Sequence, residues 1–232
     1  MDPSYIDVAD EGSKTLSVFS GTATSPPQQY SSLEGLLGGL ASLPSYVLVP
    51  EQELNAAIWG LSTASRTTML SYVSNGGTLV FASMGDSNSL SMQNQVFGWS
   101  MSSAGCFSDS TSLDANQASG TMFSGGPSTL PPLNAVFCVS MSSLPAGSRS
   151  IYYSGSAAVS VFLVTVGAGR VIGLAPDWYA TSSDWNAVLI RAVHQTQTIT
   201  ECKGLCQAGT YWTGSGSYRG GDGGEGSKSV SG

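Results

Sequence analysis

The chain has few charged residues. Lysine, arginine, aspartate and glutamate make up 10% of its 232 residues, and it contains one histidine; soluble domains average roughly a quarter charged residues. Acidic residues outnumber basic ones by 15 to 8, so the net charge is −7. This balance opposes binding to nucleic-acid backbones and to anionic membrane surfaces. No apolar run approaches the roughly 20 residues needed to cross a bilayer. We therefore expect no nucleic-acid partner and no membrane insertion.

Two further signals are missing. The first residues lack the basic start and apolar stretch of a signal peptide, and no Asn-x-Ser/Thr glycosylation pattern occurs. With so little charge, the surface must be polar through serine, threonine, glycine and amide side chains, which is typical of secreted proteins. We expect an extracellular or cell-surface location, with the signal peptide absent from this chain.

The four cysteines fall into two pairs, Cys106 with Cys138 and Cys202 with Cys206. An even number favours an oxidising compartment. A bond between Cys106 and Cys138 would close a loop of about 30 residues and stabilise the fold by about 3–4 kcal/mol; the alternative is two buried thiols. Only Cys202 and Cys206 are closely spaced, which is a poor zinc-binding pattern. We expect no metal and no cofactor.

The hydrophobic pattern, at 41% hydrophobic residues, predicts an α/β domain. We expect a mostly parallel central sheet with helices on both faces. Residues 158–166 and 170–175 are predicted to form an antiparallel edge hairpin, and residues 98–155 an irregular β-rich insertion. The expected strands are 15–20, 46–49, 78–82, 158–166 and 170–175, with short alternating pieces at 135–140 and 151–153 inside the insertion. The expected helical segments are 31–43, 54–61, 69–73 and 183–195.

The composition changes near the end of the α/β pattern. We predict an α/β domain over residues 1–198 and a tail over residues 199–232. The tail holds the second cysteine pair and then a Gly/Ser-rich run from residue 214. Such a run is typical of flexible segments.

The stretch 74–86 predicts a helix end, a buried strand and a tight strand-to-helix turn. Ser83 lies in that turn, where hydrolytic α/β proteins carry a nucleophile. A serine needs an adjacent base, but the single histidine, His194, is expected on the solvent side of the last helix. Ser83 is therefore a weak catalytic candidate. The binding candidates at this turn are Ser83, Met84, Gly85 and Asp86.

A second group of candidates follows the last predicted strand. Asp177 and Trp178 are binding candidates there. Carboxylates at the strand ends could do acid/base chemistry or bind a cation, or they could cap helices. The acids concerned are Asp86, Asp177 and Asp184. Aromatic residues could stack on sugars or pack in the core; these are Trp99, Trp178, Tyr179 and Trp185.

Three motifs resemble class I glutamine-amidotransferase-like domains, over roughly residues 15–198. They are the strand end at 46–50, the strand entry at 72–80 and the hairpin strand at 167–174. That superfamily carries a catalytic cysteine at the turn and a His-x-Glu pair after a later strand. Here Ser83 and Pro176-Asp177 hold those positions, so the resemblance implies a flavodoxin-like fold with a catalytically degenerate site. Members of the dipeptidase E type use a serine nucleophile.

The tail carries a second resemblance. Cys202, Cys206 and the Gly-Thr-Tyr at 209–211 resemble the opening of an ephrin-receptor-like cysteine-rich repeat. No further cysteine follows, so only the start of such a repeat would be present. This resemblance implies a larger secreted protein.

These observations lead to one main functional interpretation and two alternatives. The first is a non-catalytic extracellular domain that acts as a structural or ligand-binding module for an unknown protein or glycan. One alternative is a serine hydrolase or peptidase using Ser83, and the other is a carbohydrate-binding module. The sequence does not decide whether the protein is an enzyme, but the absence of the family's cysteine and of its His-x-Glu pair favours a protein without enzymatic activity.

Overall fold

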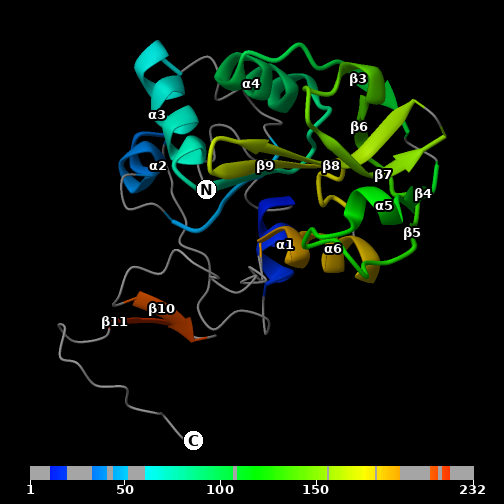
Figure 1. Ribbon diagram of the computed structural model, residues 1–232. Coiled ribbons are helices and arrows are strands. Elements are labelled where there is room, and N and C mark those ends of the chain that lie inside the picture. Colours follow the sequence, from blue (N-terminus) through cyan, green and yellow to red (C-terminus); the bar gives the residue numbers. More distant parts are fainter. Residues whose placement is uncertain are drawn as a thin grey trace, which may run out of the picture. The chain divides into compact units, whose positions relative to one another are not determined.

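The structure, a computed structural model, divides the chain into two compact units. It describes residues 11–19, 33–40, 44–51, 61–106, 109–155, 157–180, 182–193, 210–213 and 216–219. Residues 1–195 make the first unit and residues 196–232 the second. In the second unit, β10 (Thr210–Thr213) and β11 (Gly216–Arg219) form an antiparallel pair (Figure 1). Among the described residues, no helix has both the length and the apolar character to cross a membrane.

A nine-stranded sheet forms the centre of the first unit. Its main path begins β1 (Val47–Val49), β2 (Thr78–Phe81), β9 (Gly169–Leu174), β8 (Ala158–Val166), and continues β7 (Arg149–Ser154), β4 (Thr111–Leu113), β5 (Thr129–Leu130). The two remaining strands, β3 (Ser103–Gly105) and β6 (Phe137–Ser140), pair with each other, and β6 also pairs with the start of β8.

The sheet is mixed, and this corrects the expectation of a mostly parallel one. Among the described strands, only β1–β2 and β2–β9 are parallel pairs. The other pairs are antiparallel, including β8–β9, β7–β8 and β4–β7. The coarse α/β class is confirmed. The β8–β9 hairpin forms as predicted, but it lies in the middle of the sheet and not at its edge.

Helices cover both faces of the sheet (Figure 1). One face carries α2 (Leu33–Leu40), α3 (Thr63–Ser74) and α4 (Ser87–Phe97). The opposite face carries α1 (Ser13–Ser17), α5 (Ala115–Ala118) and α6 (Ser183–Val193). A short 3-10 helix, η3 (Met141–Ser143), follows β6.

Strand β2 lies between two hydrophobic cores, one on each face of the sheet. All four of its residues are buried. Leu79 and Phe81 pack in the core under α3 and α4, whereas Val80 and the following Ala82 pack in the core under α6. Successive strand residues point to opposite faces, so a strand covered on both faces carries apolar side chains on both, as Leu79, Val80 and Phe81 do here.

One local prediction is wrong. The sequence predicts a strand over residues 15–20, but residues 13–17 form the helix α1. The alternation there is short, and Val18 and Phe19 pack into the core under α6. Residues 98–155 are β-rich, as predicted, and their strands join the main sheet. The predicted helix at 54–61 lies almost wholly outside the described residues.

One disulfide joins Cys106, just after β3, to Cys138 in β6. Both side chains are buried, and their Cα atoms are 5.9 Å apart. The bond fastens β3 to β6 across their antiparallel pairing. Cys202 and Cys206 lie outside the described residues.

Candidate functional site

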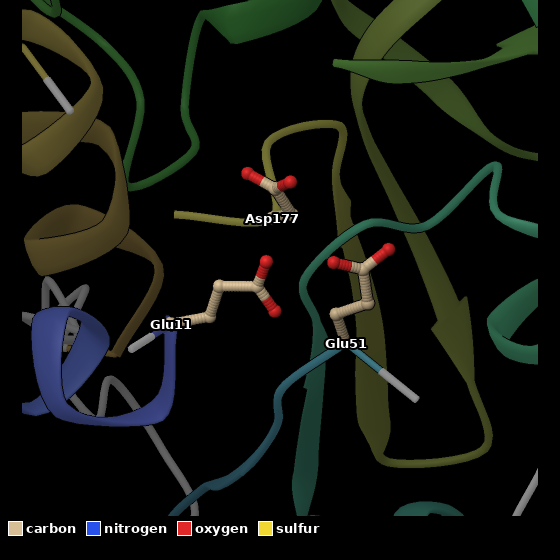
Figure 2. Close-up of side chains that lie close together, drawn as sticks. All are labelled: Glu11, Glu51 and Asp177. Atoms are coloured by element: carbon tan, nitrogen blue, oxygen red, sulfur yellow. The ribbon is translucent and has the colours of Figure 1, made fainter. Parts of the chain in front are cut away.

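Three carboxyl groups from distant parts of the chain meet at one point. Glu11, Glu51 and Asp177 each offer an oxygen, and these oxygens all lie within 4.8 Å of one another. Figure 2 shows the Glu11 side chain extending from the segment just before α1 toward the other two. Each residue is buried, with 6%, 6% and 4% of its surface exposed respectively. We call these three residues the acidic cluster.

The parallel part of the sheet explains this convergence. Glu51 lies two residues after β1, and Asp177 lies three residues after β9. Between these strands runs β2, and Ser83 lies two residues beyond its end. The carboxyl ends of adjacent parallel strands share one edge, which is where α/β sheets bind ligands.

Ser83 contacts the acidic cluster directly. Its Oγ donates a hydrogen bond to Glu51 Oε1 at 3.0 Å, and the residue is fully buried. Its φ angle is 49°, in the left-handed region that non-glycine residues rarely adopt. In the described chain, Ala135 and Trp178 are the other non-glycine residues with positive φ. Ala135 O accepts from Asp177 N at 3.4 Å, and Trp178 follows Asp177, so all three strained residues border this site. Such strain concentrates at functional sites.

The electrostatics of the cluster are dominated by desolvation. Burial, and after it the neighbouring Asp177 carboxyl group, raises the pKa of Glu51 to about 8. The hydrogen bond from Ser83 acts in the opposite direction, and Glu11 and Asp86 add smaller upward effects. At neutral pH Glu51 therefore holds a proton in the absence of a compensating cation.

The backbone N–H groups that follow Ser83 donate hydrogen bonds to neighbouring strands and loops. Met84 N donates to Leu174 O at 3.0 Å, and Gly85 N donates to Phe137 O at 3.0 Å. A β-carbon built on Gly85 would lie 2.2 Å from the carbonyl oxygen of Cys138. Only glycine therefore fits at position 85. In a nucleophile elbow, the N–H after the nucleophile helps form the oxyanion hole, and here Met84 N–H is already bonded.

Two other acids predicted from the sequence, Asp86 and Asp184, are not members of the acidic cluster. Asp86 caps α4, because its carboxylate accepts from Asn88 N at 2.8 Å and Ser89 N at 3.3 Å. Asp184 lies in the first turn of α6 and is not part of the acidic cluster. His194 lies outside the described residues. Of the three acids proposed for the strand ends, only Asp177 joins the cluster.

The aromatic residues expected at this edge are mostly in the core. Trp178 and Trp185 are 0% and 1% exposed, and their indole N–H groups donate to Asn186 Oδ1 and Pro131 O. Trp99 stacks on Phe97 with ring centroids 4.5 Å apart. Only Tyr179 of the four is exposed, at 53%, and Lys14 lies over its ring at 4.5 Å. A stacking surface for sugars is therefore not formed by Trp178 and Trp185.

Sequence reasoning missed two members of the cluster. Glu51 directly follows the strand end predicted at 46–50, and the edge argument that selects Asp177 applies to it as well. Glu11 carried no such signal, because it reaches the site from an N-terminal segment whose position depends on long-range packing. The arrangement offers carboxylate oxygens to a cation, or a buried proton to a ligand.

The comparisons with known proteins support a fold and no closer relationship. No family model and no curated protein matches the chain. A ThuA-like protein from Bacteroides uniformis is similar in structure, with a TM-score of 0.53 and 12% identity over 83% of this chain and 85% of that one. The cytoplasmic protein STM1381 of Salmonella typhimurium matches at a TM-score of 0.48 and 12% identity, over 77% of this chain and 80% of that one.

These findings correct the family identification made from the sequence. The Bacteroides uniformis neighbour, which matches at a TM-score of 0.53, is named a ThuA-like protein, and it has a class I glutamine-amidotransferase-like fold. The ephrin-receptor-like repeat is wrong, since no family model matches any part of the chain and the structural matches give it no support. What this chain shares with its neighbours is the glutamine-amidotransferase-like, flavodoxin-like fold.

Proposed function

We propose that this domain is a ligand-binding module that takes a small divalent cation, best Ca²⁺, at the acidic cluster. One observation carries the proposal: Glu11, Glu51 and Asp177, from three separate segments, bring buried carboxyl oxygens within 4.8 Å of one another. Calcium binds carboxylate oxygens at about 2.3–2.6 Å, so ligands on opposite sides of the ion are about 5 Å apart. Buried charges that approach so closely are normally paired or bound to metal.

The position of Ser83 supports a binding role over a nucleophilic one. The side chain is fully buried, and its hydroxyl bonds to Glu51. The N–H of Met84 is used by Leu174 O, so it does not stabilise an oxyanion. In this proposal Ser83 is a positioning residue that orients the Glu51 carboxylate toward the cation.

Serine hydrolysis is the second candidate, and a specific contact favours it. The Ser83–Glu51 hydrogen bond of 3.0 Å brings a nucleophile and a carboxylate base together. A base with a pKa of about 8 would make such activity rise with pH through that value. A fluorophosphonate probe that labels the wild type but not Ser83→Ala would favour this candidate.

The test is calorimetric titration of the full chain with Ca²⁺, Mg²⁺ and Mn²⁺ after treatment with a chelator. We expect Ca²⁺ to bind, and Glu51→Gln and Asp177→Asn each to weaken binding at least tenfold. Asp184→Asn is the matched control, because it removes one carboxylate outside the cluster, and it should bind as the wild type does. Binding should strengthen as pH rises toward 8, since the cation displaces the proton of Glu51.

Two results would overturn the proposal. One is the absence of heat and of thermal stabilisation with any of the three cations at millimolar concentration. The other is equal binding by the wild type and the two cluster variants, which would place the ion elsewhere.

We also propose an extracellular or cell-surface location. The buried Cys106–Cys138 bond supports it, because structural disulfides persist in oxidising compartments. Alkylation of protein isolated from its native cells, followed by intact-mass measurement, tests this. Two free thiols at Cys106 and Cys138 would contradict it.

A further inference from the structure

A second charged feature lies on the opposite end of the sheet from the acidic cluster. It is a hollow of about 210 Å³ with two arginines, Arg149 and Arg170, in its lining. Arg170 pairs with Thr78 at the beginning of β2, whereas the acidic cluster lies beyond the strand ends. In a chain with only 8 basic residues and a net charge of −7, two arginines in one hollow form an unusual concentration of positive charge.

Strand register explains why these side chains share the hollow. Arg149 in β7 is opposite Leu163 in β8, and Thr165 in β8 is opposite Arg170 in β9. Directly paired residues, and residues two apart on one strand, point to the same face of a sheet. All four therefore lie on one face, and the two arginine Cα atoms are about 12 Å apart, two strand spacings across and two residues along.

The walls and floor complete the site. Leu163 is 8% exposed and belongs to the core below, so it forms an apolar floor. Thr121 on the turn after α5 and Ala168 on the β8–β9 turn form parts of the wall. Arg191 holds the turn after α5 in place by donating to Met122 O, Ser124 O and Gly125 O.

The donors in this hollow lack protein acceptors. Within the described part of the chain, neither the Arg149 nor the Arg170 guanidinium makes a hydrogen bond or an ion pair, in contrast to Arg66 and Arg191, which donate to backbone carbonyls. Thr165 is exposed and adds a hydroxyl between the two arginines. Arginine forks match the oxygens of phosphate and sulfate groups, which accept several hydrogen bonds at once.

We propose that this hollow binds a small molecule through a tetrahedral oxyanion group, a phosphate or a sulfate, held between Arg149 and Arg170. The Thr165 hydroxyl donates a further hydrogen bond, and the apolar floor contacts the remainder of the ligand. The site is independent of the acidic cluster and of the cation proposed there.

The test is titration of the full chain with inorganic phosphate and with inorganic sulfate at constant ionic strength, with chloride as the reference. Arg149→Gln and Arg170→Gln should each weaken binding at least tenfold. Arg66→Gln is the charge-matched control in α3 and should change the dissociation constant less than twofold. Circular dichroism establishes that each variant is folded.

Each outcome decides the proposal. Binding of phosphate alone assigns a phosphate ester as ligand, binding of sulfate alone assigns a sulfate ester, and equal binding supports recognition by charge and shape; all three require the expected effect of the arginine variants. No binding of either ion at 20 mM, or equal weakening by Arg66→Gln, overturns it. Arg149→Lys and Arg170→Lys, which keep the charge but lose the fork, should recover only part of the affinity.

Discussion

The two ends of β9 carry opposite charges in opposite environments. Beyond its last residue lies Asp177, which is 4% exposed and offers an oxygen within 4.8 Å of the oxygens of two other carboxyl groups. Near its start lies Arg170, half-buried at the rim of an open hollow. Burial at the acidic end favours protonated carboxyl groups or a bound cation, whereas the basic end is only partly buried. The comparison shows that burial, more than the number of charges, decides how strongly protonation or a bound ion affects each end of the strand.

The largest effect is expected from Gly85→Ala, which alters the support of the acidic end. A β-carbon at this position would lie 2.2 Å from Cys138 O and 2.5 Å from Phe137 O, both backbone atoms. We expect a loss of about 3 kcal/mol or more in the free energy of unfolding, measured by urea denaturation.

The matched control is Gly105→Ala in β3. A β-carbon there meets nothing within 4 Å, so the change should stay within about 0.5 kcal/mol. Similar losses in the two variants would show that the close approach at Gly85 is not what constrains the turn.

A second prediction concerns the pH dependence of stability at the acidic end. The pKa of Glu51 is raised from 4.5 to about 8 in the folded protein, so the folded state binds a proton more tightly than the unfolded chain. The stability that this provides is complete below pH 4.5 and is lost as pH rises through 8. Without added cation, Glu51→Gln should therefore be more stable than the wild type above pH 8, by about 2 kcal/mol once screening by water is allowed for.

Thermal unfolding between pH 5 and 9 measures this difference. Asp184→Asn should follow the wild-type profile, because Asp184 is not in the acidic cluster. Parallel profiles for the wild type and Glu51→Gln would contradict the assignment of the proton to Glu51.

A smaller effect is expected from Ser83→Ala. The Ser83 hydroxyl donates a hydrogen bond to Glu51 and lowers the pKa of that carboxyl group. In the variant, Glu51 should therefore lose its proton only above pH 8. Once the carboxylate is ionised, the free energy of unfolding should be lower than that of the wild type by about 1 kcal/mol. Carbon-13 NMR of the glutamate carboxyl groups measures the midpoint.

Ser89→Ala provides the comparison for Ser83→Ala. Ser89 is equally buried, but its hydroxyl makes no hydrogen bond within the described structure. Its removal should leave the Glu51 midpoint and the stability nearly unchanged. A shift of the midpoint in Ser89→Ala equal to that in Ser83→Ala would disprove a specific role for the Ser83 hydroxyl.

The smallest effect is expected at the basic end. Arg149→Gln and Arg170→Gln remove hydrated side chains that bond to no acceptor in the described chain, so each should change the free energy of unfolding by less than about 0.5 kcal/mol. Urea denaturation in chloride buffer measures this. A decrease of more than about 1 kcal/mol in the free energy of unfolding would show that the arginines stabilise the fold. The two ends of β9 would then not differ in their contribution to stability.

The sequence predicted the longer or fully buried strands β2, β8 and β9, and the strand β1, better than the short strands between residues 103 and 154. Strands β1 and β2 and the helix α6 have strong apolar patterns, because each is covered by a core. The strands between residues 103 and 154 are short, and several are half-exposed. Their pairing depends on partners far away in sequence, which local patterns do not encode.

The sequence predicted only those parts of the candidate site that follow from the parallel strands. The strand-to-helix turn at Ser83 and the acid Asp177 follow from the rule that parallel strands end at one edge. The roles of Asp86 as a cap and of Trp178 as a core residue depend on hydrogen bonds and packing seen only in three dimensions. Glu11 is brought into the site by packing between distant segments, so no local motif marks it.

The contact between Gly85 and Cys138 has one further consequence. The turn that carries Ser83 rests on β6, and β6 is fastened to β3 by the Cys106–Cys138 bond. The structure that supports the turn at Ser83 thus includes the disulfide. We expect reduction of the bond between the two sulfur atoms to weaken this support, although neither cysteine belongs to the acidic cluster.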